Sequence, residues 1–249
     1  MLAFRNNNEY DPKYTRKDYH STFSWRRKNL GLPMPIILRL LSDYNAFRSR
    51  KKNSQKRTVE KLPNRLARVI ERFQSHVKKL GVTCISDVRP RAKNYHEILI
   101  AMAEAVEDLD KLKTKTPIVP MLGSKALHFT MPEFFPVWDT ERIKKQCLAH
   151  ENMTDLKEEI AEVIDALETK AAKEYAVYVH LLVTERAKIS RSKYQQVENA
   201  CIAKALGPRD ARRANWAKQV LDWDYDDMST VVFEICLLGK HRRHIKPRK

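Results

Sequence analysis

Apolar residues at helical spacing are the feature of this sequence that most restricts its fold. Between Leu62 and Leu80 they mostly fall three or four positions apart, and similar spacing recurs over residues 36–47, 98–109 and 156–182. This period places apolar side chains on one face of an α-helix. The 249 residues include only five glycines, too few for the many tight turns of a sandwich or barrel. The sequence therefore predicts an all-α, multi-helix globular protein.

The same period places the individual helices. Helices are expected over residues 35–47, 62–80 and 95–112, with Gly81 as a C-terminal cap and the EDLDK run facing outward on the third. The segment 156–182 is expected to be one long core-forming helix with Thr154 as its N-cap. Further helices are expected over residues 194–206 and 209–221, and residues 231–238 fit helix or strand equally well.

Positive charge is concentrated in the first part of the chain, although the whole chain carries +17. Residues 1–95 hold 23 Lys+Arg against 7 Asp+Glu, or +16, whereas residues 96–249 hold 25 against 24, or +1. We therefore distinguish a basic helical N-terminal region (1–95), a helical domain (96–238) and a basic tail (239–249). Such asymmetry favours a polyanionic partner, most commonly nucleic acid. A solvated basic surface is the alternative interpretation.

The basic run SRKKNSQKR is expected to form a surface loop between the first two helices. Its Arg50, Lys51 and Lys52 are candidates for contacts with DNA phosphates. A solvated turn is an equally good interpretation of the run.

Other sequence features limit where the protein acts and what it binds. No segment approaches the roughly 20 apolar residues of a membrane span, and no signal peptide is evident. An intracellular protein without a membrane partner is expected, in the cytoplasm or nucleoid if bacterial. The four cysteines are far apart and form no C-x-x-C pair, so no zinc or iron–sulfur site is indicated.

The stretch PMLGSKALHFTMPEFFPVWDTERIKK, residues 120–145, has both a structural and a chemical interpretation. Structurally, Ser124 caps one helix and Asp139 or Thr140 caps the next. Chemically, a buried aspartate can stabilise the positive charge that develops on a sugar as its base departs. A lysine whose pKa is lowered by desolvation can instead attack C1′ and form a Schiff base.

The order of a hairpin, a lysine and an aspartate segment in this stretch resembles that of the helix-hairpin-helix DNA glycosylase superfamily. PMLGSKA resembles its hairpin and lysine, with Met121 where the family usually has a glycine, and FPVWDTERIKK resembles its aspartate segment. The resemblance implies catalysis by Asp139 and, in bifunctional members, by Lys125. It also implies DNA phosphate binding by the hairpin, here Leu122, Gly123 and Ser124.

The leading hypothesis is therefore a DNA glycosylase that flips a damaged or modified base out of double-stranded DNA and hydrolyses its N-glycosidic bond. The enzyme is expected to act as a monomer without metal or organic cofactor. Base-excision repair and defence against phage with modified DNA both fit.

His128 and Trp138 are candidates for the base pocket, or alternatively a structural histidine and a core tryptophan. The rival hypothesis is a non-catalytic helical protein that binds DNA or RNA. A metal-dependent nuclease is disfavoured because no compact D/E-x-K arrangement lies on a predicted strand.

Overall fold

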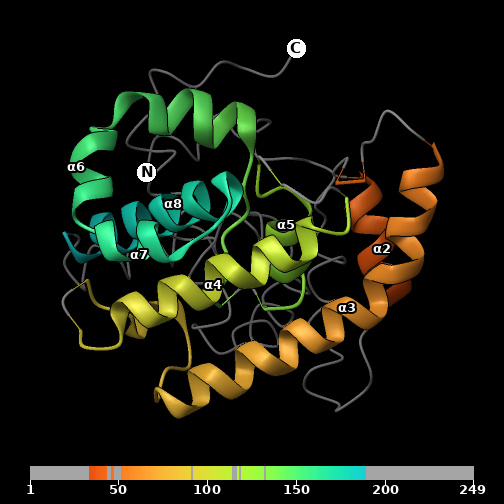
Figure 1. Cartoon of the computed structure of the whole chain (residues 1–249), viewed down its shortest axis with the longest axis horizontal. Coiled ribbons are helices and arrows are strands. Elements are labelled where there is room, and N and C mark those ends of the chain that lie inside the picture. The colour runs from red at the N-terminus through yellow and green to blue at the C-terminus, as the bar shows by residue number, and fades with distance from the viewer. Residues whose placement is uncertain are drawn as a thin grey trace, which may run out of the picture.

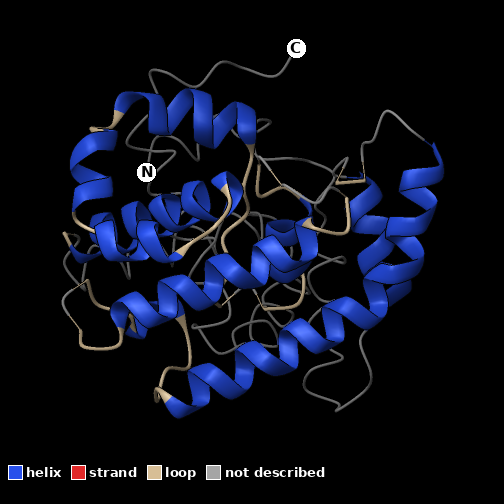
Figure 2. Ribbon diagram, viewed as in Figure 1, coloured by secondary structure: helices blue, strands red, loops and turns tan. Residues whose placement is uncertain are grey.

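The protein is all-α, as the helical spacing predicts. The computed structural model describes residues 34–43, 46–47, 52–90, 92–113, 117, 119–131 and 133–188. Within these ranges every regular element is a helix and no strand occurs (Figure 2). The helices expected over residues 194–206 and 209–221, the segment 231–238 and the basic tail lie outside the described residues.

Figure 1 shows the arrangement of the described helices, coloured in their order along the chain. The α-helices are α2 (Met34–Asp43), α3 (Lys52–Lys79), α4 (Tyr95–Asp110), α5 (Leu122–His128), α6 (Met153–Glu158), α7 (Ala161–Ala166) and α8 (Lys170–Ala187). The tighter or wider helical turns are η2 (Ile85–Asp87), η3 (Thr140–Cys147) and η4 (Leu148–His150).

Helix α4 is the centre of the packing. It contacts α3 on one side, α7 and α8 on another, and α5 at its C-terminal end. Figure 1 shows it crossing the middle of the molecule between α3 and α8. Because a helix surrounded on several sides buries more than one stripe, α4 has buried side chains around most of its circumference.

Helix α3 differs from its prediction at the start and agrees at the end. It begins at Lys52, so part of the expected SRKKNSQKR loop is helical. Pro63 therefore lies inside the helix, where it supplies no N–H, and α3 bends in its N-terminal part (Figure 1). At the other end Gly81 has φ +67°, and the Val82 N–H donates to the Val77 carbonyl at 3.1 Å. This is the glycine C-cap that the sequence predicts.

The segment 156–182 is core-forming, as predicted, but it is not one helix. It is divided into α6, α7 and α8, and the N-cap of α6 is Asn152 rather than Thr154. The Asn152 side chain accepts the N–H of Thr154 at 3.2 Å, and the Thr169 side chain accepts the Ala172 N–H at 3.3 Å to begin α8. Competing side-chain caps inside an apolar period thus end one helix and begin another.

The EDLDK run is also only partly exposed, contrary to expectation. Glu107 and Asp110 are 4% and 3% exposed. Glu107 pairs with Lys111, whose Nζ lies 2.8 Å from Glu107 Oε1. Asp110 faces α5, as described below. These two acidic side chains of the central helix are thus buried because each meets a partner group from the same chain.

Within the described residues, one hydrophobic core includes side chains from both sides of the expected boundary between residues 95 and 96. Phe73 of α3, for example, packs on Phe134 and Phe135, with ring centroids 5.1 Å and 4.7 Å apart. No helix in the described part of the chain combines the length and the apolar character that a membrane crossing requires.

Candidate functional site

The first turn of α5 faces the interior of the protein. The Leu122 N–H donates to Asp110 Oδ1 of α4 at 2.8 Å, and Leu122, Gly123 and Ser124 are all buried. The sequence predicts that this turn presents its N–H groups to a DNA phosphate. In the structure an internal carboxylate occupies that position, because it compensates both the unpaired N–H groups and the positive end of the helix dipole.

Gly123 is explained by packing between helices. A methyl group at this position would overlap the carbonyl oxygen of Val106 and would lie 2.7 Å and 2.8 Å from the Val106 carbonyl carbon and Cα. Only a residue without a side chain allows α5 to approach the backbone of α4 so closely. The glycine that resembles a hairpin glycine therefore brings two helices together.

Burial strongly perturbs the carboxyl group of Asp110. Desolvation raises its pKa to about 7, although the N–H groups of Leu122 and Gly123 and the charge of Lys113 oppose the change. Its second oxygen, Oδ2, has no hydrogen-bond partner among the described residues. The helix α5 is thus anchored on a carboxyl group that titrates near neutral pH.

The extended segment FFPVW, residues 134–138, is held from two sides. From α5, the Ser124 hydroxyl accepts the Trp138 N–H at 3.2 Å and itself donates to the Pro120 carbonyl at 2.5 Å. From α8, two tyrosine hydroxyls donate to carbonyls of the segment. These bonds are Tyr175 to Pro136 at 2.9 Å and Tyr178 to Val137 at 3.2 Å.

This segment fixes the position of Asp139, which follows directly after it. The Asp139 carbonyl accepts the N–H groups of Ile143 and Lys144 at 2.8 Å and 3.3 Å, so it begins the helical turn η3. Its side chain is half-buried. Lys125 is 6% exposed on α5. The bond between Ser124 and Trp138 joins the neighbours of these two residues, so the lysine and aspartate segments lie side by side.

The two candidates for the base pocket are buried in the core. His128 is 1% exposed, and its Nδ1 lies 2.8 Å from the Phe135 carbonyl oxygen, to which it donates because a carbonyl can only accept. Desolvation lowers the pKa of His128 to about 4. Trp138 is fully buried, and its ring meets that of Tyr178 edge to face at 5.6 Å. The burial and contacts of both residues fit the structural alternative, and their place in a base pocket stays a prediction.

A second buried polar network links α4 and α8. The Tyr95 hydroxyl lies 2.5 Å from Nδ1 of His180, and His180 Nε2 lies 2.8 Å from Glu159 Oε2. Tyr95 and His180 are almost fully buried, whereas the Glu159 side chain is 57% exposed. Desolvation lowers the pKa of His180, so the network favours a neutral imidazole that accepts from Tyr95 and donates to Glu159.

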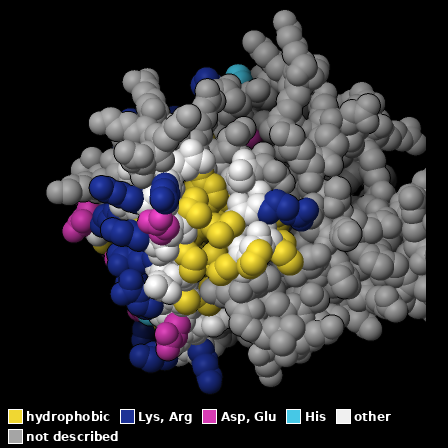
Figure 3. Space-filling model, turned by 90° about the vertical axis from the view of Figure 1, so that its right-hand side faces the viewer, with side chains coloured by type: hydrophobic (Ala, Val, Ile, Leu, Met, Phe, Trp, Pro, Cys, Tyr) yellow, Lys and Arg dark blue, Asp and Glu magenta, His cyan; other side chains and the backbone are white. Residues whose placement is uncertain are grey.

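Helix α3 carries the most concentrated positive charge in the described part of the chain. Six of its cations fall at intervals of 4, 4, 3, 4 and 7 residues, so at about 100° per residue these six lie along one face. We call this set the basic stripe: Arg57, Lys61, Arg65, Arg68, Arg72 and Lys79. Where α2 and the start of α3 face the viewer, Lys and Arg side chains gather along one edge beside a hydrophobic patch (Figure 3).

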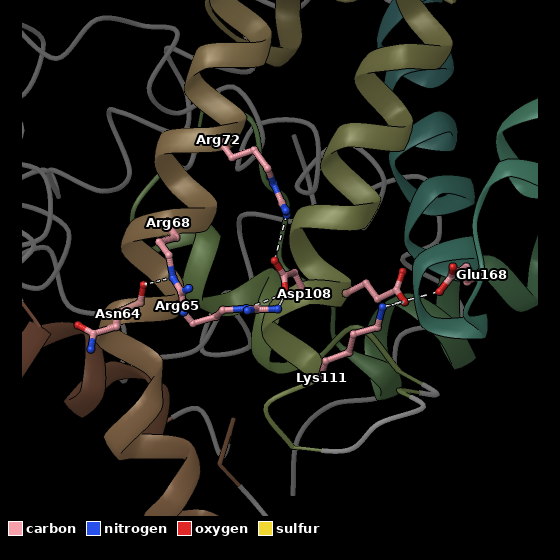
Figure 4. Close-up of polar contacts among 8 residues, drawn as sticks. Asn64, Arg65, Arg68, Arg72, Asp108, Lys111 and Glu168 are labelled. Atoms are coloured by element: carbon pink, nitrogen blue, oxygen red, sulfur yellow. Dashed lines mark hydrogen bonds and ion pairs between the residues drawn. The ribbon is translucent and has the colours of Figure 1, made fainter.

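Two arginines of the stripe share one acidic partner on α4. Arg65 donates to Asp108 Oδ1 through Nε at 2.7 Å and also through Nη2, and Arg72 Nη2 lies 3.0 Å from Asp108 Oδ2. Figure 4 shows both side chains reaching from α3 toward Asp108. Beside them a groove of about 420 Å³ is lined by Lys61, Arg65, Arg68 and Lys111 together with Glu60, Asn64, Asp108 and Leu112.

The basic stripe was only partly visible in the sequence. The expected phosphate contacts were Arg50, Lys51 and Lys52. Arg50 and Lys51 lie outside the described residues, and Lys52 is the first residue of α3, with an undescribed side chain. The signal for the stripe was the helical spacing of cations opposite the apolar face.

Comparison of the chain with protein-family models, with curated proteins and with solved structures finds no match. Within the described residues, no three His, Cys, Asp or Glu side chains are grouped as a metal site would require.

Proposed function

We propose that the protein binds double-stranded DNA through the basic stripe of α3, by contacts to the phosphate backbone. The observation that supports this proposal most directly is the alignment of six cations on one face of a single helix. Phosphate contacts of this kind position a protein on a duplex without reading its sequence. Binding is therefore expected to be largely independent of base sequence.

The cations of the stripe are accessible to a ligand. Lys61 and Arg68 are exposed, as are Arg57 and Lys79. Arg68 donates to the Asn64 carbonyl at 3.3 Å, a contact to a neutral group, and no acidic side chain among the described residues pairs with it. Neutralising DNA phosphates with such side chains releases condensed counterions, and this release drives binding at low salt.

The test compares two double variants that remove the same charge from different surfaces. Lys61→Gln with Arg68→Gln changes the stripe, and Lys157→Gln with Lys170→Gln changes exposed lysines of α6 and α8. Affinity for a labelled duplex is measured by fluorescence anisotropy over a range of salt concentrations. Losing two phosphate contacts should reduce the slope of log K against log salt by about 2.

The control variant should keep the slope of the wild-type protein. A wild-type affinity that does not depend on salt would refute the proposal. So would an equal loss of slope in both double variants, because binding would then follow net charge rather than the surface of α3.

A DNA glycosylase is the second candidate, favoured by one observation. The hydrogen bond between Ser124 and Trp138 holds the segments of Lys125 and Asp139 side by side, as a shared catalytic site requires. In this proposal Asp139 stabilises the sugar cation or positions water, and Lys125 forms a Schiff base in a bifunctional enzyme. Since Lys125 is 6% exposed, the hairpin region would have to open to admit a flipped nucleotide.

Activity tests separate the two candidates. Duplexes that contain a panel of modified bases are incubated with the protein, and hot alkali then reveals abasic sites as strand breaks. If Lys125 forms a Schiff base, borohydride added during turnover should trap a covalent adduct between protein and DNA. The Lys125→Ala variant should form no such adduct. Salt-dependent binding without any strand break across the panel would support the DNA-binding function alone. It would also exclude excision of the bases tested.

A further inference from the structure

Asp108 is much less exposed than Arg65 and Arg72, the two arginines with which it forms ion pairs. The Asp108 side chain is 15% exposed, whereas those of Arg65 and Arg72 are 38% and 63% exposed. The carboxylate therefore lies below the surface with the two cations above it. One negative charge faces two positive charges, so the cluster keeps a net charge of +1.

The two guanidinium groups keep donors available for a further acceptor. Arg65 uses Nε and one Nη2 hydrogen for Asp108, and Arg72 uses a single Nη2 hydrogen. Every guanidinium has additional N–H groups in the same plane, arranged to meet two oxygens of a phosphate at once. The lining of the adjacent groove adds three more cations and one carboxylate, which are Lys61, Arg68, Lys111 and Glu60.

We propose that the groove between α3 and α4 is a phosphodiester-binding site and that Asp108 is its positioning residue. The inference rests on the proposed function, because the phosphodiester is that of bound DNA. A free arginine loses side-chain entropy when it binds a phosphate. Asp108 restricts Arg65 and Arg72 before the ligand arrives, so less entropy is lost on binding.

Charge and positioning predict opposite effects when Asp108 becomes neutral. If Asp108 acted only through its charge, Asp108→Asn would remove a repulsive group near the phosphate and strengthen DNA binding. If it positions the arginines, the same change weakens binding, because the side chains regain their freedom. We expect Asp108→Asn to weaken duplex binding by at least about threefold.

Two further variants make the experiment specific. Glu71→Gln removes one negative charge from an exposed position of α3, the helix of Arg65 and Arg72, and should bind DNA as tightly as the wild-type protein or more tightly. Arg72→Lys keeps the charge of a mostly exposed residue but loses the planar donors, and it should weaken binding about as much as Asp108→Asn. The double variant of Asp108 and Arg72 should be little weaker than either single variant, because both remove the same arrangement.

The measurement is anisotropy of a labelled duplex at constant salt, with inorganic phosphate as a competitor in a parallel series. Competition at millimolar phosphate in the wild-type protein, lost in Arg72→Lys, would support a site for the phosphate group itself. Equal or tighter duplex binding by Asp108→Asn, with salt-dependent binding retained by the wild-type protein, would overturn this inference alone. Salt-independent binding by the wild-type protein would instead overturn the proposed function and the inference with it. If Asp108→Asn fails to fold, unchanged binding by Arg72→Lys is sufficient to reject the site.

Discussion

Replacement of Asp110 by asparagine should change how the stability of the protein depends on pH. Asparagine has nearly the same shape and keeps an acceptor for the Leu122 N–H, which lies 2.8 Å from Asp110 Oδ1. It removes the proton equilibrium of the buried carboxyl group. The variant therefore tests the titration of this group while the cap of α5 is retained.

The direction follows from the pKa of Asp110 in the two states. Burial raises it from the ordinary value of 3.8 to about 7 in the folded protein. Between these values the folded state binds more protons than the unfolded state, so the free energy of unfolding falls as pH rises from about 4 to about 7. At about 1.4 kcal/mol for each pKa unit, the loss is about 4 kcal/mol. Above pH 7 the contribution levels off.

The assay is urea unfolding followed by far-UV circular dichroism at a series of pH values between 4 and 8. His128 has the opposite effect, since burial lowers its pKa to about 4 and stability from this group rises with pH up to about 6.5. It is present in both proteins and is removed by subtraction. The unfolding free energy of the wild-type protein minus that of Asp110→Asn should fall by about 4 kcal/mol over the range.

A difference that stays constant with pH would refute the reasoning, because it would mean that the carboxyl group titrates equally in both states. A difference that rises with pH would be a stronger refutation. It would show that the N–H groups of Leu122 and Gly123 stabilise the charged carboxylate by more than burial destabilises it. Asp110→Leu, which removes the acceptor altogether, should be less stable than Asp110→Asn at every pH by about 1–3 kcal/mol.

Three other substitutions test the segments around α5 by chemical denaturation or by activity. Gly123→Ala should lower the free energy of unfolding by about 3 kcal/mol or more, because its methyl group would overlap the backbone of Val106; wild-type stability in this variant would contradict the close helix contact. Ser124→Ala should lower it by about 1–3 kcal/mol, because the buried Trp138 N–H loses its acceptor, and an unchanged urea midpoint would argue against that bond. Asp139→Asn should stop base release in the alkali assay while duplex affinity persists, if the protein is a glycosylase; undiminished release would show that the aspartate only begins a helical turn.

The helical composition and most of the core were predictable because periodicity is a local property. Ile98, Met102 and Val106 are buried on α4 as their spacing predicts. The start of α3 was not predictable in the same way. The apolar period that predicts this helix begins at Leu62. Val59 is the one strongly apolar residue between Lys52 and Lys61, so no apolar period extends the prediction toward Lys52.

The candidate site was less predictable because its contacts join residues distant in sequence. Gly123 resembles a hairpin glycine, but the constraint on it comes from Val106 of another helix. The burial of Asp110 depends on Leu122, twelve residues further on. Asp108 pairs with Arg65 and Arg72 across α3 and α4. No periodic or motif-based signal specifies which helix faces which.

The short helices α6 and α7 identify where the chain should tolerate alteration. Helix α6 has no buried residue, and Val163 is the one buried residue within α7. Such elements unfold locally at little free-energy cost, so amide hydrogens there should exchange with solvent long before those of α4. In limited proteolysis, the first cut within the described residues should fall in α6 or α7. A reporter peptide inserted there should leave the rest of the protein folded.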